Sequence, residues 1–177
     1  MFRFVFMLGI FCTTLMGAEI FSFLGITTAG SWLRQVVVNS SQDMNFKEDL
    51  QDPTNSGSSS TRLAIVFSAD DELSKTLKGM SSSDFFKQKD ELMKKYPDTY
   101  YYTMIDVVPS NTQTIDMRPR PDQKKVYDKT TFVVAYWEYD IEGNHMSVIP
   151  VDKVSVMFTF NRKEVVISYP TSAEIKK

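Results

Sequence analysis

The side chains that most often perform chemistry are scarce in this chain. Its 177 residues include one cysteine, Cys12, and one histidine, His145. One cysteine cannot form an internal disulfide, and the pair cannot supply the three or four ligands of a Cys/His zinc site. His145 follows Asn144 at an expected hairpin, and we interpret it as an exposed turn residue. Carboxylate-only sites for Ca²⁺ or Mg²⁺ stay possible, but no loop has oxygen ligands at alternate positions around a central glycine. The sequence therefore predicts no metal site and no cofactor.

Acidic and hydroxyl clusters also have structural explanations. The acidic residues 70–72 lie at the start of an expected helix, where carboxylates interact favourably with the helix dipole. Serines 81–83 precede a second helix and lack the Gly-x-Ser-x-Gly setting of a hydrolase nucleophile. Tyrosines 100–102 and Trp137 fit either a sugar-binding platform or core and cross-strand aromatic packing. We find no catalytic constellation and predict that the protein is not an enzyme.

Composition describes a chain that can fold but has no excess of positive charge. Apolar residues make up 42% and aromatic residues 13%, enough to fill one packed core. The 20 Lys and Arg residues are balanced by 22 Asp and Glu residues, which gives a net charge of -2. Such a chain cannot neutralise many phosphates, so nucleic acid is not an expected partner. A small-molecule substrate is not expected either.

The N-terminus has the pattern of an export signal. Arg3 is followed by a charge-free run over residues 4–18, which is shorter than the roughly 20 residues that span a bilayer. We interpret residues 1–18 as a signal sequence and residues 19–33 as an apolar linker. Three outcomes stay open: cleavage after Ala18, lipid attachment at Cys12, or an uncleaved anchor. Phe11 before Cys12 is unusual for lipid attachment, which favours a small residue there.

The rest of the chain, residues 34–170, is predicted to be a β-sandwich domain followed by a tail, residues 171–177. Short apolar or alternating runs are separated by turn residues, a pattern typical of two packed sheets. In one run, Leu63, Ile65 and Phe67 should face one side of the sheet and the residues between them the other. The predicted strands are residues 35–38, 61–69, 100–108, 112–117, 130–141, 145–151, 153–161 and 164–169.

A helical insertion, residues 70–97, separates the second and third strands. Asp70 and Asp71 can cap a first helix that ends at Gly79. Ser81 and Asp84 resemble a capping box for a second helix. We expect the two helices to form a lid on one end of the sandwich.

The polar segment of residues 40–60 is the other notable feature. It is either a plain connection or a functional loop, because twenty structureless residues are uncommon inside a compact domain. Phe46 and Leu50 are four residues apart and would lie on one side of a helical turn as apolar anchors for a partner. Pro53 and Gly57 would end that turn.

The order of these parts resembles the TssJ family, the outer-membrane lipoproteins of the bacterial type VI secretion system. The resemblance covers about residues 34–169. The segments that carry it are residues 36–41 (VVVNSS), 63–67 (LAIVF), 79–86 (GMSSSDFF), 107–115 (VVPSNTQTI) and 132–136 (FVVAY).

The resemblance implies a mainly β, transthyretin-like two-sheet sandwich in the periplasm, held at the inner leaflet of the outer membrane by a lipid on Cys12. It also implies that the loop after the first strand, here residues 42–60, binds the periplasmic domain of the inner-membrane protein TssM. The predicted partner-binding residues are Phe46, Lys47, Glu48, Asp49, Leu50, Asp52 and Pro53. The alternative function is an exported ligand- or carbohydrate-binding sandwich, which would need exposed aromatic rings.

Overall fold

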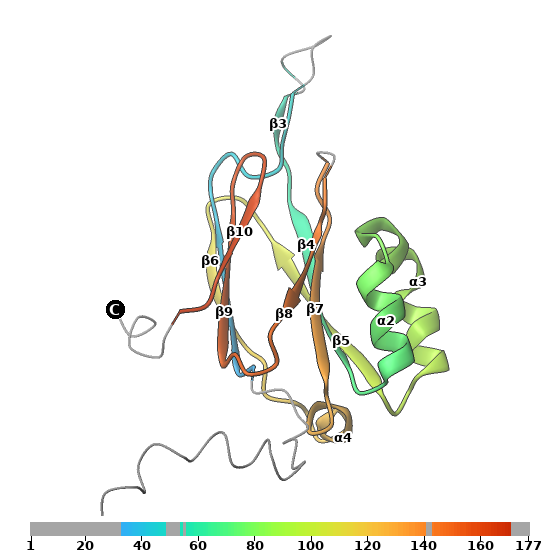
Figure 1. Cartoon of the computed structure of the whole chain (residues 1–177). Helices are drawn as coiled ribbons and strands as arrows, with labels where there is room; N and C mark the ends of the chain where they lie inside the picture. The colour runs from blue at the N-terminus through green and yellow to red at the C-terminus, as the bar shows by residue number, and fades with distance from the viewer. Residues whose placement is uncertain (1–32, 49–53, 55, 141–142, 171–177) are drawn as a thin grey trace, which may run out of the picture.

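The computed structural model describes residues 33–48, 54, 56–140 and 143–170. Within these ranges two four-stranded sheets face each other (Figure 1). The first sheet, in the order β10-β9-β1-β6, contains β1 (Gln35–Ser40), β6 (Thr112–Asp116), β9 (Ser155–Phe160) and β10 (Val165–Ser168). The second, in the order β5-β4-β7-β8, contains β4 (Thr61–Ser68), β5 (Tyr100–Val107), β7 (Phe132–Trp137) and β8 (Met146–Ile149). The predicted sandwich is confirmed, and each predicted run overlaps one of these strands; β1 extends two residues beyond its predicted end at residue 38.

The first sheet is built around the parallel pair β1 and β9. Val36 lies opposite Val156 and Val38 opposite Phe158, so their side chains point to the same face. All four are buried in the core between the sheets. β6 and β10 complete the sheet as antiparallel edge strands.

The central strand β4 is buried on both faces. Leu63, Ile65 and Phe67 belong to the core between the sheets, as their alternation predicts. Ala64 and Val66 point the other way, into a second apolar cluster. The second sheet therefore needs cover on its outer face as well.

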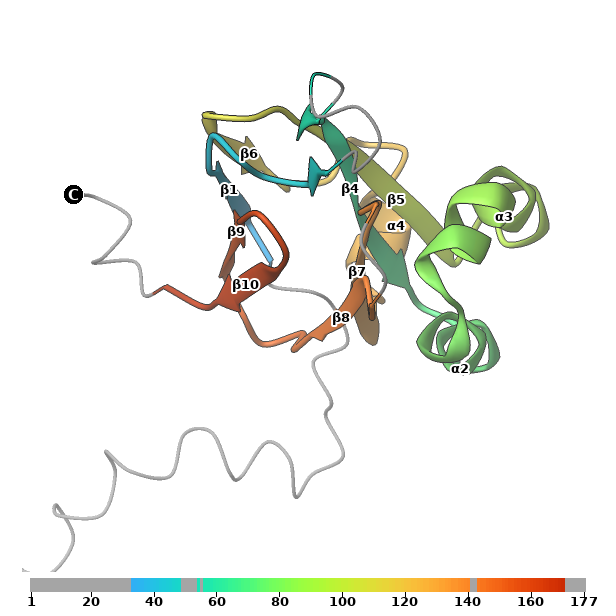
Figure 2. The same cartoon turned by 90° about the horizontal axis from the view of Figure 1, so that it is seen from above.

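Two helices supply that cover. They are α2 (Asp71–Gly79) and α3 (Ser82–Lys95). Seen from above, they lie outside the second sheet as a third layer (Figure 2). Phe85 stacks on Tyr136 of β7 with the ring centroids 4.3 Å apart, and the Tyr136 hydroxyl donates to the Leu77 carbonyl. The expected lid on one end of the sandwich is therefore wrong, because the apolar outer face of the sheet is where the helices bury their own apolar side chains.

Both predicted helix starts are confirmed. The Asp70 carboxylate accepts from the Leu73 N–H at 2.8 Å, and Ser81 Oγ accepts from the Asp84 N–H at 3.1 Å. Each satisfies an N–H that the first turn of a helix leaves without an intrahelical partner. The caps thus set where the helical layer begins.

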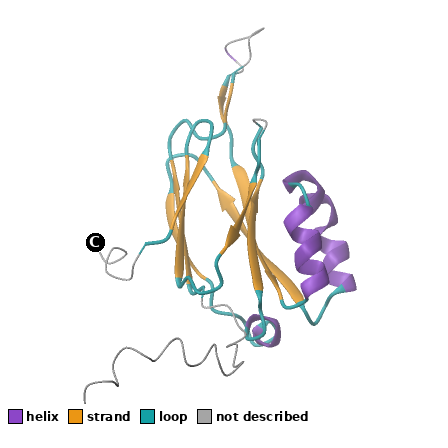
Figure 3. Cartoon of the chain, in the orientation of Figure 1, coloured by secondary structure: helices purple, strands orange, loops and turns teal. Residues whose placement is uncertain are grey.

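A short helix, α4 (Lys124–Tyr127), was not predicted. It lies at the end of the sandwich where β1 begins (Figure 1), and it is the small purple helix at that end in Figure 3. The Tyr127 hydroxyl donates to the Leu33 carbonyl, and Arg34 lies over the Tyr127 ring at 5.3 Å. The described chain thus begins at this end. The predicted signal sequence, Cys12 and the C-terminal tail lie outside the described residues and stay predictions.

Trp137 tests the packing between the sheets. Its side chain is 5% exposed, and its ring meets Phe158 of the opposite sheet edge-on at 6.4 Å. Trp137→Ala should lower the free energy of unfolding by about 3–5 kcal/mol, the usual cost of truncating a buried tryptophan. Denaturant titration measures this, with Val166→Ala on the exposed side of β10 as the control. An unchanged midpoint for Trp137→Ala would contradict the packing described.

Candidate functional site

Two short strands between β1 and β4 pair as a hairpin at the end of the sandwich opposite α4 (Figure 1). They are β2 (Phe46–Lys47) and β3 (Gly57–Ser58), which pair antiparallel. The predicted helical turn at Phe46 is therefore wrong: Phe46 is in an extended strand, paired with Ser58. Asp49, Leu50, Asp52 and Pro53 lie outside the described residues, so their place in the site stays a prediction.

Asn45 fixes the base of this hairpin. Its backbone has φ 46°, in the left-handed region that asparagine tolerates better than most residues. Its side-chain amide donates to Ser59 Oγ at 2.7 Å and to Asp140 Oδ2 at 3.5 Å. Its Oδ1 accepts from the Asp140 N–H at 2.9 Å. With 3% of its surface exposed, Asn45 joins the two arms of the hairpin to the loop after β7.

Tyr139 extends this network to a third loop. Its hydroxyl accepts from the Asn45 N–H at 3.3 Å and donates to the Asn161 carbonyl in the turn between β9 and β10. The Asn45 N–H also reaches that carbonyl at 3.3 Å. Burial raises the pKa of Tyr139 to about 12, so the hydroxyl keeps its proton at neutral pH. The hairpin, the loop after β7 and the β9–β10 turn are thereby held together.

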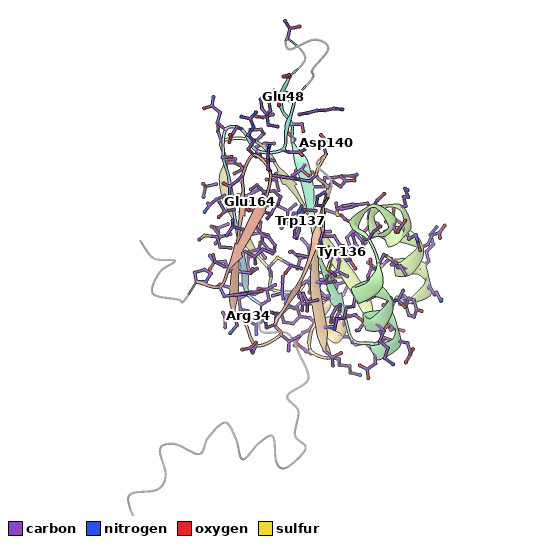
Figure 4. The ribbon with its side chains drawn as sticks, turned by 45° about the horizontal axis from the view of Figure 1, so that its top comes forward. Arg34, Glu48, Tyr136, Trp137, Asp140 and Glu164 are labelled. Carbon is purple, nitrogen blue, oxygen red and sulfur yellow. The ribbon has the colours of Figure 1, made fainter. Side chains whose placement is uncertain are left out.

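Phe46 packs against the β9–β10 turn. The Arg162 guanidinium lies over the Phe46 ring, 4.3 Å from its centroid. Beside this contact is a hollow of about 310 Å³. It is lined by Phe46, Lys47, Glu48, Asp140, Arg162 and Lys163. In Figure 4, Glu48 and Asp140 lie toward the hairpin end of the sandwich, and Arg34 lies toward the opposite end.

The hollow brings three predicted contact residues together and adds others. Phe46, Lys47 and Glu48 share it, as a common partner surface requires. Sequence reasoning missed Asn45, Asp140 and the cationic pair of the β9–β10 turn. These residues come from distant parts of the chain, and the polar character of their loops was the only local signal.

A larger groove of about 960 Å³ runs from the hairpin base to the start of α3. On its wall the Arg62 guanidinium forms two bonds to the Glu138 carboxylate, at 2.5 and 2.8 Å, and these raise the pKa of Arg62. The same guanidinium lies over the Phe86 ring at 5.2 Å. These charges therefore already have partners within the domain.

The aromatic residues do not form an exposed platform. Tyr100, Tyr101 and Trp137 are buried, and Tyr102 is half-buried with its hydroxyl donating to the Asp90 carboxylate at 2.6 Å. His145 is half-buried rather than an exposed turn residue, because its ring packs 5.9 Å from Tyr139 and 6.4 Å from Trp137. A sugar platform needs rings open to solvent, so these positions argue against carbohydrate binding there.

The described residues also bear on metal binding and on membrane spanning. No three His, Cys, Asp or Glu side chains in those ranges are grouped so that they could hold a metal ion. None of the helices in the same ranges has the length and apolar character needed to cross a membrane.

Solved structures show where this fold occurs. The chain is similar to Serratia marcescens Lip, a membrane-bound component of the type VI secretion system, with 8% identity, 76% of this chain and 95% of that chain covered, and a TM-score of 0.52. It is similar to the type VI lipoprotein TssJ1 from Pseudomonas aeruginosa, with 11% sequence identity and a TM-score of 0.51. That alignment covers 79% of this chain and 98% of TssJ1. A chain from the structure of the type VI protein TssM C-terminal domain from EAEC aligns with 10% sequence identity and a TM-score of 0.53. That alignment covers 78% of this chain and 98% of the other chain.

These similarities establish the fold. They confirm, at that level, the resemblance to type VI lipoproteins found in the sequence. No family model and no curated protein sequence matches the chain. Each neighbour is covered almost end to end, so the shared part includes the whole sandwich rather than one sheet.

Asn45→Ala tests the network at the hairpin base. The change removes the side-chain bonds to Ser59 and Asp140 and places an alanine at positive φ. We expect the free energy of unfolding in denaturant to fall by about 1–3 kcal/mol, the usual effect of leaving buried polar groups without partners. Asn45→Gly should cost less than Asn45→Ala, because glycine accepts this backbone conformation. Asn144→Ala, in an exposed turn, is the control; equal effects of all three changes would contradict the role of Asn45.

Proposed function

We propose that this protein is a periplasmic structural component of the type VI secretion membrane complex, associated with the outer membrane, and that it docks the periplasmic domain of TssM. The observation that carries the proposal is the hairpin at one end of a sandwich fold shared with two type VI components. In this role the chain binds a protein partner; it catalyses no reaction and needs no cofactor.

The hairpin is suited to docking because it is already ordered at its base. Asn45 and Tyr139 hold it against two other loops before any partner arrives. A preformed surface loses less conformational entropy on binding than a loose loop does. Phe46 is half-buried beside an open hollow, where a partner could cover the rest of its ring. We assign Phe46 and Leu50 as apolar anchors and Lys47, Glu48, Asp49 and Asp52 as the polar rim around them. Pro53 completes the set of contact residues.

The two ends of the sandwich suit two different tasks. The described chain begins with Leu33 and Arg34 beside α4, whereas the hairpin lies at the other end (Figure 4). In the proposal, the N-terminal segment keeps the α4 end at the outer membrane. The hairpin then points into the periplasm, toward a partner rooted in the inner membrane.

The docking surface is tested by the double change Phe46→Ala and Leu50→Ala. Truncating a central apolar anchor costs about 2 kcal/mol or more, on the order of thirtyfold in affinity. The double variant should lose capture of the TssM periplasmic domain in a pulldown. Its melting temperature should stay unchanged, because the hairpin lies outside the core clusters formed by the described residues.

Lys47→Ala is the matched control on the same strand. A charge at the rim affects orientation and encounter more than strength, so this variant should bind almost normally. If the double variant binds with unaltered affinity, the hairpin is only a connection. The contact would then have to be sought on the sheets or the helical layer.

The proposed location is tested by mass spectrometry of the mature chain from the envelope. We expect export with processing, because a charge-free run follows Arg3. A chain that begins at Glu19 indicates cleavage after Ala18, and a lipid-modified Cys12 indicates an anchor in the inner leaflet of the outer membrane. An intact chain from Met1 in the cytoplasm contradicts the location.

A further inference from the structure

We propose that the β9–β10 turn is the second half of the docking surface, and that Arg162 and Lys163 there receive an acidic side chain of the partner. This inference rests on the proposed function, since it concerns the same partner. It adds a second contact segment, more than a hundred residues along the chain from the hairpin, and states the chemistry that this segment recognises.

The turn and the hairpin present one continuous surface. Asn161 is bonded through its carbonyl to Tyr139 and Asn45, and its N–H donates to the Glu164 carbonyl at 2.9 Å. The turn is therefore held on both sides. Since Arg162 lies over the Phe46 ring, a partner that covers Phe46 must also meet Arg162.

The cations of this surface are not neutralised within the described structure. Elsewhere such groups lie near carboxylates, as Arg62 does with Glu138 at 2.5 Å and Lys125 with Asp98 at 3.1 Å. Arg162 and Lys163 are exposed and form no ion pair with a described carboxylate.

Two carboxylates, those of Glu48 and Asp140, also line the hollow. Asp140 points its Oδ2 at the hairpin base, where it accepts from Ser59 Oγ at 3.3 Å and from Asn45 at 3.5 Å. Lys47 also lines the hollow and has no described ion-pair partner. The hollow is thus lined by three cations, Lys47, Arg162 and Lys163, against two carboxylates, and one of these carboxylates is hydrogen-bonded at the hairpin base. This excess of positive charge favours an incoming anion.

Arginine can contact the ring and the anion at once. Its planar guanidinium stacks on Phe46 by its face and keeps N–H donors at its edge for a carboxylate. The expected occupant is an aspartate or glutamate of the TssM segment that covers Phe46. Lys163 adds a second positive charge that steers this segment into place.

The test measures binding of the full-length protein to the TssM periplasmic domain by surface plasmon resonance at low and high salt. The double reversal Arg162→Glu and Lys163→Glu should weaken affinity by about tenfold or more, slow association and flatten the salt dependence. Arg162→Lys keeps the charge and should keep the association rate, but it should dissociate faster because the planar fork is lost. Unchanged melting temperatures show that the variants fold.

The control is a matched reversal, Arg120→Glu and Lys129→Glu, on exposed cations near α4. This variant should bind normally. If both reversals weakened the affinity for TssM equally, the inference would be overturned, because the effect would then come from the net charge of the protein and not from the β9–β10 turn. Normal binding after reversal at the β9–β10 turn, with binding lost in the Phe46 and Leu50 variant, would overturn the inference and leave the proposed function standing. Normal binding in both would overturn both.

Discussion

The arrangement of the hairpin end depends on one buried asparagine in a left-handed backbone conformation. Asn45 turns the chain out of the first sheet, and its side chain bonds both the far arm of the hairpin and the loop after β7. Tyr139 carries the constraint on to the β9–β10 turn. Three loops that would otherwise move separately become one surface, and for this reason Phe46 and Arg162 can act as a unit.

The sandwich beneath supplies the rigidity that this surface needs. β4 is apolar on both sides, so the second sheet is packed against the first sheet on one face and against α2 and α3 on the other. The loops at the two ends of the sandwich are therefore the segments whose sequences can vary without disturbing the core. In the proposed role, the domain acts as a stiff spacer between the α4 end, assigned to the membrane, and the hairpin end, assigned to the partner.

Patterns of neighbouring residues predicted much of the fold, and contacts between distant residues account for what was missed. Alternation revealed β4, and capping residues revealed both long helices. Helical spacing does not show which surface a helix covers, so the predicted position of α2 and α3, at one end of the sandwich, was wrong. A two-residue strand has no readable pattern, so Phe46 was assigned to a turn. Asn45 and Tyr139 are 94 residues apart, and no local signal connects them.

The central claim is that the partner binds the hairpin end of the sandwich. Amide hydrogen exchange of the full-length protein, alone and with the TssM periplasmic domain, tests it most directly. The account predicts added protection in β2, β3, the loop after β7 and the β9–β10 turn, with little change elsewhere. Protection confined to α2 and α3, or to the outer face of the first sheet, would contradict it.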